Sequence, residues 1–233
     1  MVSAVLNLLI VMMLAFFAWA GFRKGLILSA ASLVIFFISI MVGVSVAAQN
    51  TESVAVKFDD LLSWVADDAT EKAMAGLNGI DREKVTSAQA KSISEKAFTQ
   101  MGIQKSAAEY LSGIVSKRFT ANGDETLYEV VSAVFLRALA WVALFFAGFL
   151  VTNLLLSLIV NFIAALFNMP VLKWLDTIGG TVLGLFTGIF IMCAVGLGLR
   201  YLGMLLPDGL VDNTLLLKLF VYANPFGGVM AIK

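Results

Sequence analysis

The stretch VLKWLDTIGGTVLGLFTGIFIM, residues 171–192, decides the fold class. After Asp176 it carries no charged residue, and about 20 apolar residues are enough for a helix to cross a bilayer. In water, each glycine would cost such a helix about 0.5–1 kcal/mol relative to alanine. In lipid, small residues let two helix backbones approach closely. The stretch therefore predicts a transmembrane helix with a packing seam at three glycines spaced by four: Gly180, Gly184 and Gly188. A glycine-lined path or hinge is the alternative.

The composition of the whole chain is typical of a membrane protein. Hydrophobic residues make up 60% and charged residues 14% of the chain, against roughly 45–50% and about 25% in soluble domains. The formal net charge is zero, so we expect no nucleic acid as a partner. There is no histidine and one cysteine, Cys193, which excludes intramolecular disulfides, Cys/His metal centres and histidine acid–base catalysis. We expect no catalytic residues, no cofactor and no metal, and therefore no enzyme.

Four windows without charged residues predict four membrane-spanning helices, because a charge at the bilayer centre costs several kcal/mol. We place these helices at about 3–21, 26–48, 132–167 and 178–205. The third window is longer than a simple crossing needs, and Pro170 predicts its end. The predicted fold class is all-α: a polytopic membrane helix bundle with four transmembrane helices and a small helical polar insert.

The polar insert sets the predicted domain organisation. Its apolar positions recur at helical spacing, which predicts helices near 54–65, 87–100 and 106–119. The apolar tail carries charges and predicts a short interfacial helix at about 212–222. The predicted parts are a transmembrane hairpin at 1–48, the insert at 49–131, spans three and four at 132–206, and an interfacial tail at 207–233.

The orientation follows from the short loops, because Lys and Arg are enriched on the cytoplasmic side of a membrane. Arg23 and Lys24 lie in the turn between spans one and two, and Lys173 lies between spans three and four. Both turns are therefore predicted to be cytoplasmic. This places both termini and the insert on the opposite side.

Five polar residues of the predicted spans are candidate functional residues. Asp176 stands just before the predicted fourth helix and can cap its N-terminus; the alternative is a carboxylate that contacts protons or cations. Asn153, Ser157 and Asn161 recur every four residues along the third span. They predict interhelical hydrogen bonds or, alternatively, a polar pathway. Asn7 in the first span is a candidate partner for them.

Two segments carry a family resemblance. The first turn has the motif Gly21, Phe22, Arg23, Lys24 and Gly25, and the last span opens with Asp176 followed by the seam glycines. Together these segments resemble the two signatures of the colicin V production protein (CvpA) family of bacterial multi-pass inner-membrane proteins. The chain departs from the pattern of many members at Asn7, where they carry an acid, and at Leu28 and Ser29, where they carry an Arg–Glu pair.

The resemblance implies a function in the bacterial inner membrane, linked to colicin V (bacteriocin) production or export and to envelope homeostasis. It supplies no known reaction. We expect a non-enzymatic scaffold or accessory protein, with extracytoplasmic insert and termini, that contacts the lipid bilayer and forms a homo-oligomer or binds other membrane proteins. The alternative is a small oligomeric transporter or channel with a polar path along spans three and four.

Overall fold

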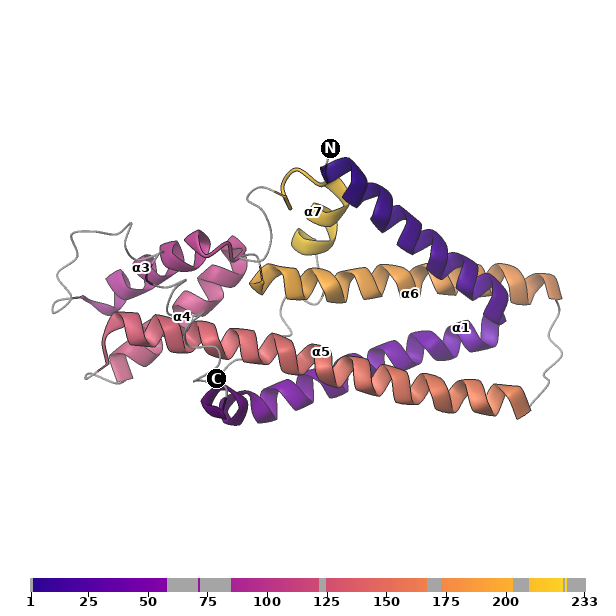
Figure 1. Cartoon of the computed structure of the whole chain (residues 1–233), viewed down its shortest axis with the longest axis horizontal. Coiled ribbons are helices and arrows are strands. Elements are labelled where there is room, and N and C mark those ends of the chain that lie inside the picture. The colour runs from indigo at the N-terminus through magenta and orange to yellow at the C-terminus, as the bar shows by residue number, and fades with distance from the viewer. Residues whose placement is uncertain are drawn as a thin grey trace. The chain divides into compact units, whose positions relative to one another are not determined.

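All regular secondary structure that the computed structural model describes is helical. The model describes residues 2–57, 71, 85–121, 125–166, 173–202, 210–223 and 225. The helices are α1 (Val2–Lys57), α3 (Ser87–Gln100), α4 (Lys105–Ala121), α5 (Leu127–Leu166), α6 (Lys173–Tyr201) and α7 (Leu215–Tyr222) (Figure 1). Among them, α1, α5 and α6 are long and apolar enough to cross a membrane. The predicted all-α class is confirmed for the described residues.

The helix α1 consists of two arms that meet at Gly25. This glycine has φ 81° and ψ 176°, which no α-helix contains. Glycine adopts this backbone conformation readily, whereas a residue with a Cβ atom rarely does. Figure 1 shows the chain turning sharply at the junction, so that the second arm runs back from it. One glycine thus divides a very long apolar helix into a first arm at 2–24 and a second arm at 26–57.

The chain forms two compact units. The first unit contains α1 up to Val46, α5 from Leu144, α6 up to Leu197, and α7. The second unit contains the end of α1 from Ala47, then α3, α4, the beginning of α5 up to Ala143, and the last turn of α6.

Aromatic rings and two glycines hold the second arm of α1 against α5 and α6 in the first unit. Phe36 is fully buried, and its ring centroid lies 5.6 Å from that of Phe149 on α5 and 5.9 Å from that of Phe190 on α6. Each such ring pair contributes about 0.5–1.5 kcal/mol beyond the burial of its area. A Cβ atom on Gly148 would lie 3.2 Å from the Cα atom of Gly43. The arm and α5 therefore approach each other almost backbone to backbone at this pair.

The short helix α7 is held by the first arm of α1. The backbone N–H of Leu216 donates a hydrogen bond to Oδ1 of Asn7 over 3.0 Å. The first N–H groups of a helix have no partner inside it, and the N-cap residue Thr214 makes no side-chain cap bond. Phe220 is buried in the same cluster as Ile10. The interpretation of Asn7 as a partner of the polar residues on the third span is therefore wrong, because its amide caps α7 instead.

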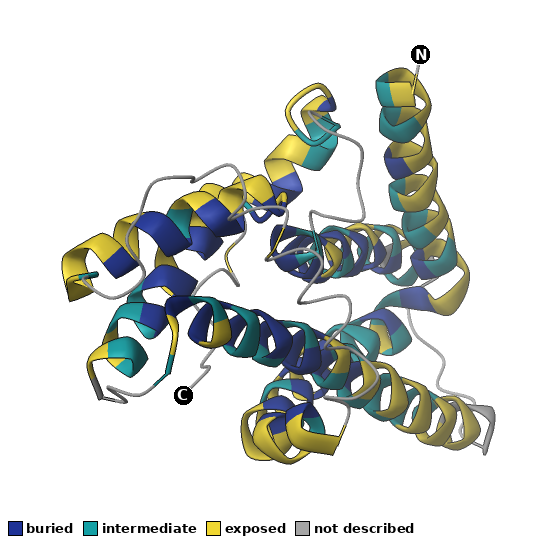
Figure 2. Cartoon of the chain, turned by 60° about the vertical axis from the view of Figure 1, so that its left-hand side comes forward, coloured by how far each residue is buried: buried dark blue, intermediate teal, exposed yellow. Residues whose placement is uncertain are grey.

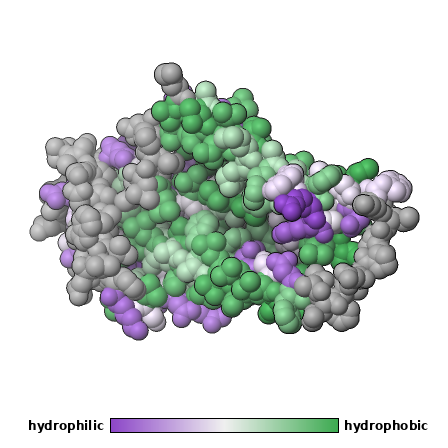
Figure 3. All heavy atoms as spheres, turned by 45° about the vertical axis from the view of Figure 1, so that its right-hand side comes forward, coloured by the Kyte–Doolittle hydropathy of each residue, from purple (hydrophilic) through white to green (hydrophobic). Residues whose placement is uncertain are grey.

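Two stretches of the first unit carry large apolar residues that are exposed, the first arm of α1 and the C-terminal half of α5. Figure 2 shows both stretches coloured largely as exposed or intermediate. On the arm they include Val5, Leu8, Met12, Phe16 and Trp19, and on α5 Leu150, Leu154, Leu158 and Phe162. Figure 3 shows continuous apolar areas on the visible surface. Contiguous apolar surface of this extent marks a membrane or protein contact.

In the second unit, α3 and α4 form a hairpin with clear local signals. Thr86 and Gln89 bond each other's backbone N–H groups at the start of α3, a capping box. At its end, the N–H groups of Gly102 and Ile103 donate to the carbonyls of Thr99 and Phe98, and Gly102 has φ 82°. This is a Schellman motif, which favours glycine at that position. The predicted helix at 87–100 coincides with α3, and α4 contains the predicted helix at 106–119.

Several predicted boundaries differ from the structure. The helix α5 begins at Leu127 and not at 132, because Thr126 and Glu129 form reciprocal backbone bonds at its start. The helix α6 spans Lys173–Tyr201 and not 178–205. The tail helix α7 is shorter than predicted, and α1 continues through Lys57. The rest of the helix predicted at 54–65 lies outside the described residues, as does Pro170.

A buried arginine ties the last turn of α6 to the start of α4. The side chain of Arg200 donates from Nε to Oε1 of Gln104 over 2.8 Å and from Nη2 to Oγ of Ser106. Its carbonyl accepts from the backbone N–H of Gln104 over 3.1 Å. Its charge also lies at the C-terminal end of α6, where the helix dipole favours a cation.

Arg200→Ala is expected to destabilise the second unit by about 1–3 kcal/mol, because it removes the charged hydrogen bonds from α6 to Gln104 and Ser106. Thermal unfolding of the purified protein in detergent measures the effect. Lys105→Ala is the matched control, since this neighbouring lysine is exposed. Equal unfolding midpoints for the two variants would show that the Arg200 contacts do not stabilise the fold.

Candidate functional site

The turn of α1 and the start of α6 meet in direct backbone contact. A Cβ atom on Gly180 would lie 2.5 Å from the carbonyl oxygen of Gly21 and 2.7 Å from the carbonyl carbon of Gly25. A Cβ atom on Gly184 would lie 2.8 Å from the Cα atom of Gly21. Real Cβ atoms do not approach other atoms this closely. The two helices can cross at this distance because all four positions are glycine.

The seam loosens along α6. A Cβ atom on Gly188 would meet the side chain of Phe17, 2.9 Å from its Cβ atom, and no backbone atom is among its nearest neighbours. Side chains can adjust where backbones cannot. The contact of α6 with the first arm of α1 is therefore tightest at Gly180 and Gly184.

Asp176 connects the same two elements by a hydrogen bond. Its Oδ1 accepts from the backbone N–H of Leu26 over 2.6 Å. Leu26 is the first residue of the second arm of α1, so this N–H has no partner within that arm. The carboxylate also faces the positive end of the arm's dipole. Asp176 thus caps the second arm of α1.

The predicted role of Asp176 as the cap of its own helix is wrong. The helix α6 begins at Lys173, which places Asp176 within its first turn. Gly25 explains how the carboxylate reaches across: a Cβ atom there would lie 2.6 Å from Oδ1 of Asp176. Gly25 is therefore required both for its backbone conformation and for the space that Asp176 occupies.

The side chains of the turn in α1 have different surroundings. The guanidinium of Arg23 lies over the ring of Trp19, 5.1 Å from its centroid, a cation–π contact. The ring of Phe22 is exposed. Lys24 lines a cavity beside the glycine crossing.

This cavity has a volume of about 110 Å³ and lies between both arms of α1, α5 and α6. Its polar lining consists of Lys24, Ser29, Ser32, Asn153, Ser157 and Thr187. The hydroxyls of Ser32 and Thr187 donate to carbonyls of their own helices, each over 2.9 Å, and the Ser29 hydroxyl donates to the Gly21 carbonyl over 3.4 Å. Their oxygens keep acceptor capacity for a guest.

The size of the cavity limits what it can hold. It has room for a few water molecules or a small ion. Sites for larger ligands occupy about 300–1,000 Å³. The cavity is therefore suited to water or a small ion.

The structure brings only part of the predicted polar set together. Asn153 and Ser157 line the cavity, but Asn161, one turn further along α5, is exposed and does not line it. Sequence reasoning missed Ser29, Ser32 and Thr187. Ser29 and Ser32 lie three residues apart in a charge-free span, a weak signal for one polar face. Nothing in the sequence singles out Thr187.

The comparison with known proteins gives one family match. The model of a family described as Colicin V production protein matches residues 103–225. This match covers more than half of the chain and includes Asp176 and the seam glycines of α6, while the turn of α1 lies outside it. No curated protein and no solved structure matches the chain. The chain belongs to the colicin V production protein family.

Proposed function

We propose that this protein is a non-enzymatic scaffold of the bacterial inner membrane that supports toxin production or secretion and envelope homeostasis. The observation that carries the proposal is the direct backbone contact of Gly21 with Gly180 and Gly184 where α1 crosses α6. A crossing without side chains between the backbones fixes the hairpin of α1 against α6. A rigid membrane anchor of this kind suits a protein that holds partners in place.

The proposed topology has four crossings. Each arm of α1 is long enough to span a hydrocarbon core of about 30 Å, because a helix rises 1.5 Å per residue. The helices α5 and α6 supply the other two crossings. With Arg23 and Lys24 on the cytoplasmic side, both termini and the polar insert are extracytoplasmic.

The proposed partners are lipids and other membrane proteins, including further copies of this chain. The support is the exposed apolar surface on the first arm of α1 and on α5, which includes Trp19 and Phe162. Acyl chains cover such a surface in a monomer. Helices of a neighbouring protein cover it in an assembly.

A second candidate function is the passage of water or a small ion. The polar cavity between α1, α5 and α6 favours it, because polar side chains within a membrane bundle often mark a pathway. Its small volume and the tight glycine contact beside it favour the scaffold.

Asn153→Leu separates the two functions, since it removes a polar group from the cavity and fills part of it. Asn161→Leu is the matched control: the same change on the same helix, outside the cavity. For a scaffold, both variants should restore toxin secretion to a producing strain that lacks the gene, and proteoliposomes of the wild type should pass no ions. Loss of secretion in Asn153→Leu alone, together with ion flux through the wild type, would establish transport instead.

A further inference from the structure

The second unit contains a groove of about 800 Å³, far larger than the cavity in the first unit. Residues of α3, α4 and the beginning of α5 line it. Its volume falls within the range of about 300–1,000 Å³ that is usual for small-molecule sites. The groove is therefore large enough for a ligand with several functional groups.

The charged residues that line the groove are mainly basic. Lys91 of α3, Lys117 and Arg118 of α4, and Arg137 of α5 all line it, and Glu109 is the acidic residue among them. The whole chain has zero formal net charge. The fold thus brings four cations from three helices to one groove, and the local field favours an anion.

Arg118 has a donor that no described residue satisfies. Its Nε and Nη2 atoms bind the two carboxylate oxygens of Glu125 over 3.2 and 3.3 Å. Its third nitrogen, Nη1, is buried and has no hydrogen-bond partner among the described residues. A buried donor without a partner destabilises the fold. The guanidinium of Arg118 is therefore held by Glu125 through two nitrogens, and its third nitrogen is left without a partner among the described residues.

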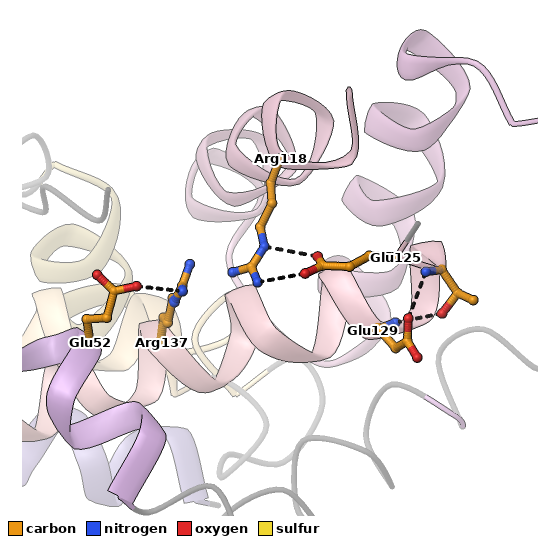
Figure 4. A network of polar contacts seen from close by, with 6 residues as sticks. Glu52, Arg118, Glu125, Glu129 and Arg137 are labelled. Carbon is orange, nitrogen blue, oxygen red and sulfur yellow. Dashed lines mark hydrogen bonds and ion pairs between the residues drawn. The ribbon is translucent and has the colours of Figure 1, made fainter. Parts of the chain in front are cut away.

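Arg137 lines the same groove as Arg118. Figure 4 shows the side chain of Arg118 extending from α4 and that of Arg137 from α5, each with a glutamate partner, Glu125 and Glu52 respectively; the charges of the two arginines repel. Glu52 binds Nη2 of Arg137 over 3.0 Å. The Glu52 side chain is 80% exposed, so this ion pair offsets little of the repulsion. Glu125 also attracts Arg137, but its two carboxylate oxygens are already bound to Arg118.

We propose that the groove binds a phosphate group between the guanidinium groups of Arg118 and Arg137. A guanidinium fork matches the oxygens of a phosphate in geometry and charge. The anion removes the repulsion between the two arginines and accepts from Nη1 of Arg118. The exposed side chains of Lys91 and Lys117 add positive charge at the edge of the groove.

Two sources offer this phosphate. Arg137 is the last charged residue before the charge-free part of α5, and a charge at the end of a membrane-spanning helix lies at the level of the phospholipid headgroups. A soluble phosphate compound offers the same chemistry. The groove recognises the phosphate in both cases, and the experiment distinguishes the sources.

The test uses the full-length protein in nanodiscs. Native mass spectrometry counts phosphatidylglycerol retained from mixed bilayers with phosphatidylcholine, and calorimetry in pure phosphatidylcholine measures binding of glycerol 3-phosphate. We expect saturable binding of at least one probe that weakens with salt. Arg118→Gln combined with Arg137→Gln should weaken it at least about tenfold, because both charged donors are lost. Retention of phosphatidylglycerol alone identifies a lipid, and binding of glycerol 3-phosphate alone identifies a soluble ligand.

A pair of lysine variants keeps the test decisive if the arginine variants fold poorly. Lys91→Gln removes a charge from the groove, and Lys96→Gln removes one from the same helix outside it. Both side chains are exposed, so neither change should affect folding. We expect weaker binding only for Lys91→Gln. Equal affinities for these two variants, or no binding of either probe to the wild type, would overturn the proposal.

Discussion

Gly180→Leu is expected to prevent formation of the native first unit. Even the Cβ atom of the new side chain would lie 2.5 Å from the carbonyl oxygen of Gly21 and 2.7 Å from the backbone of Gly25. Backbone atoms cannot turn away as a side chain can, so α6 and α1 must separate. The yield of monodisperse protein after detergent extraction measures this loss.

Gly180→Ala is expected to destabilise the first unit less than Gly180→Leu does. It adds only the Cβ atom and should cost about 1–3 kcal/mol or more, as overpacking of a tight core does. Val182→Leu is the control, because Val182 lies on the same helix with 48% of its surface exposed. Wild-type extraction and thermal stability for Gly180→Leu would show that the crossing is not closely packed, and the scaffold proposal would lose its main support.

Asp176→Ala is expected to destabilise the hairpin of α1 by about 1–3 kcal/mol. It removes the acceptor for the N–H of Leu26, which then has no partner at the start of the second arm. The loss of a negative charge at the N-terminus of that arm adds to the effect. Hydrogen exchange at Leu26 reports the broken bond directly, and thermal unfolding in detergent reports the change in stability.

Asp176→Asn distinguishes a cap from a carboxylate that handles protons or cations. Asparagine keeps an oxygen that can accept from Leu26 and loses only the charge, and Asn is as good as Asp at capping positions. We therefore expect most of the stability and of toxin secretion to remain. A stable Asp176→Asn variant without secretion would instead assign Asp176 a role that needs its charge.

Local signals in the sequence predicted the parts of the fold that depend on neighbouring residues. The helix α3 lies where it was predicted, since a capping box at Thr86 starts it and Gly102 ends it. The apolar character of α1, α5 and α6 follows from long runs without charge. The turn in α1 was also foreseen, because two charges and two glycines interrupt those runs between Gly21 and Gly25.

The predictions for Asp176 and Asn7 failed for one shared reason. Asp176 was predicted to cap its own helix, and Asn7 was predicted to bond the polar residues of the third span. In the structure each side chain caps the N-terminus of another helix. Asp176 bonds Leu26, 150 residues away, and Asn7 bonds Leu216, 209 residues away. The sequence indicates that a short polar side chain in an apolar segment needs a hydrogen-bond partner. It does not indicate which distant backbone N–H group that side chain reaches.

The sequence by itself determined the helical class, the apolar character of the long helices, the spacing of the glycines on α6 and the family resemblance, because hydrophobic runs and residue spacing act locally. Only the tertiary structure decided what the seam contacts, and it showed Gly21 and Gly25 opposite Gly180 and Gly184. It also decided which polar residues line the cavity, including Thr187 beside Asn153, and which cations meet at Arg118. The reason is that contacts between distant segments depend on how the helices pack, which no local pattern of residues encodes.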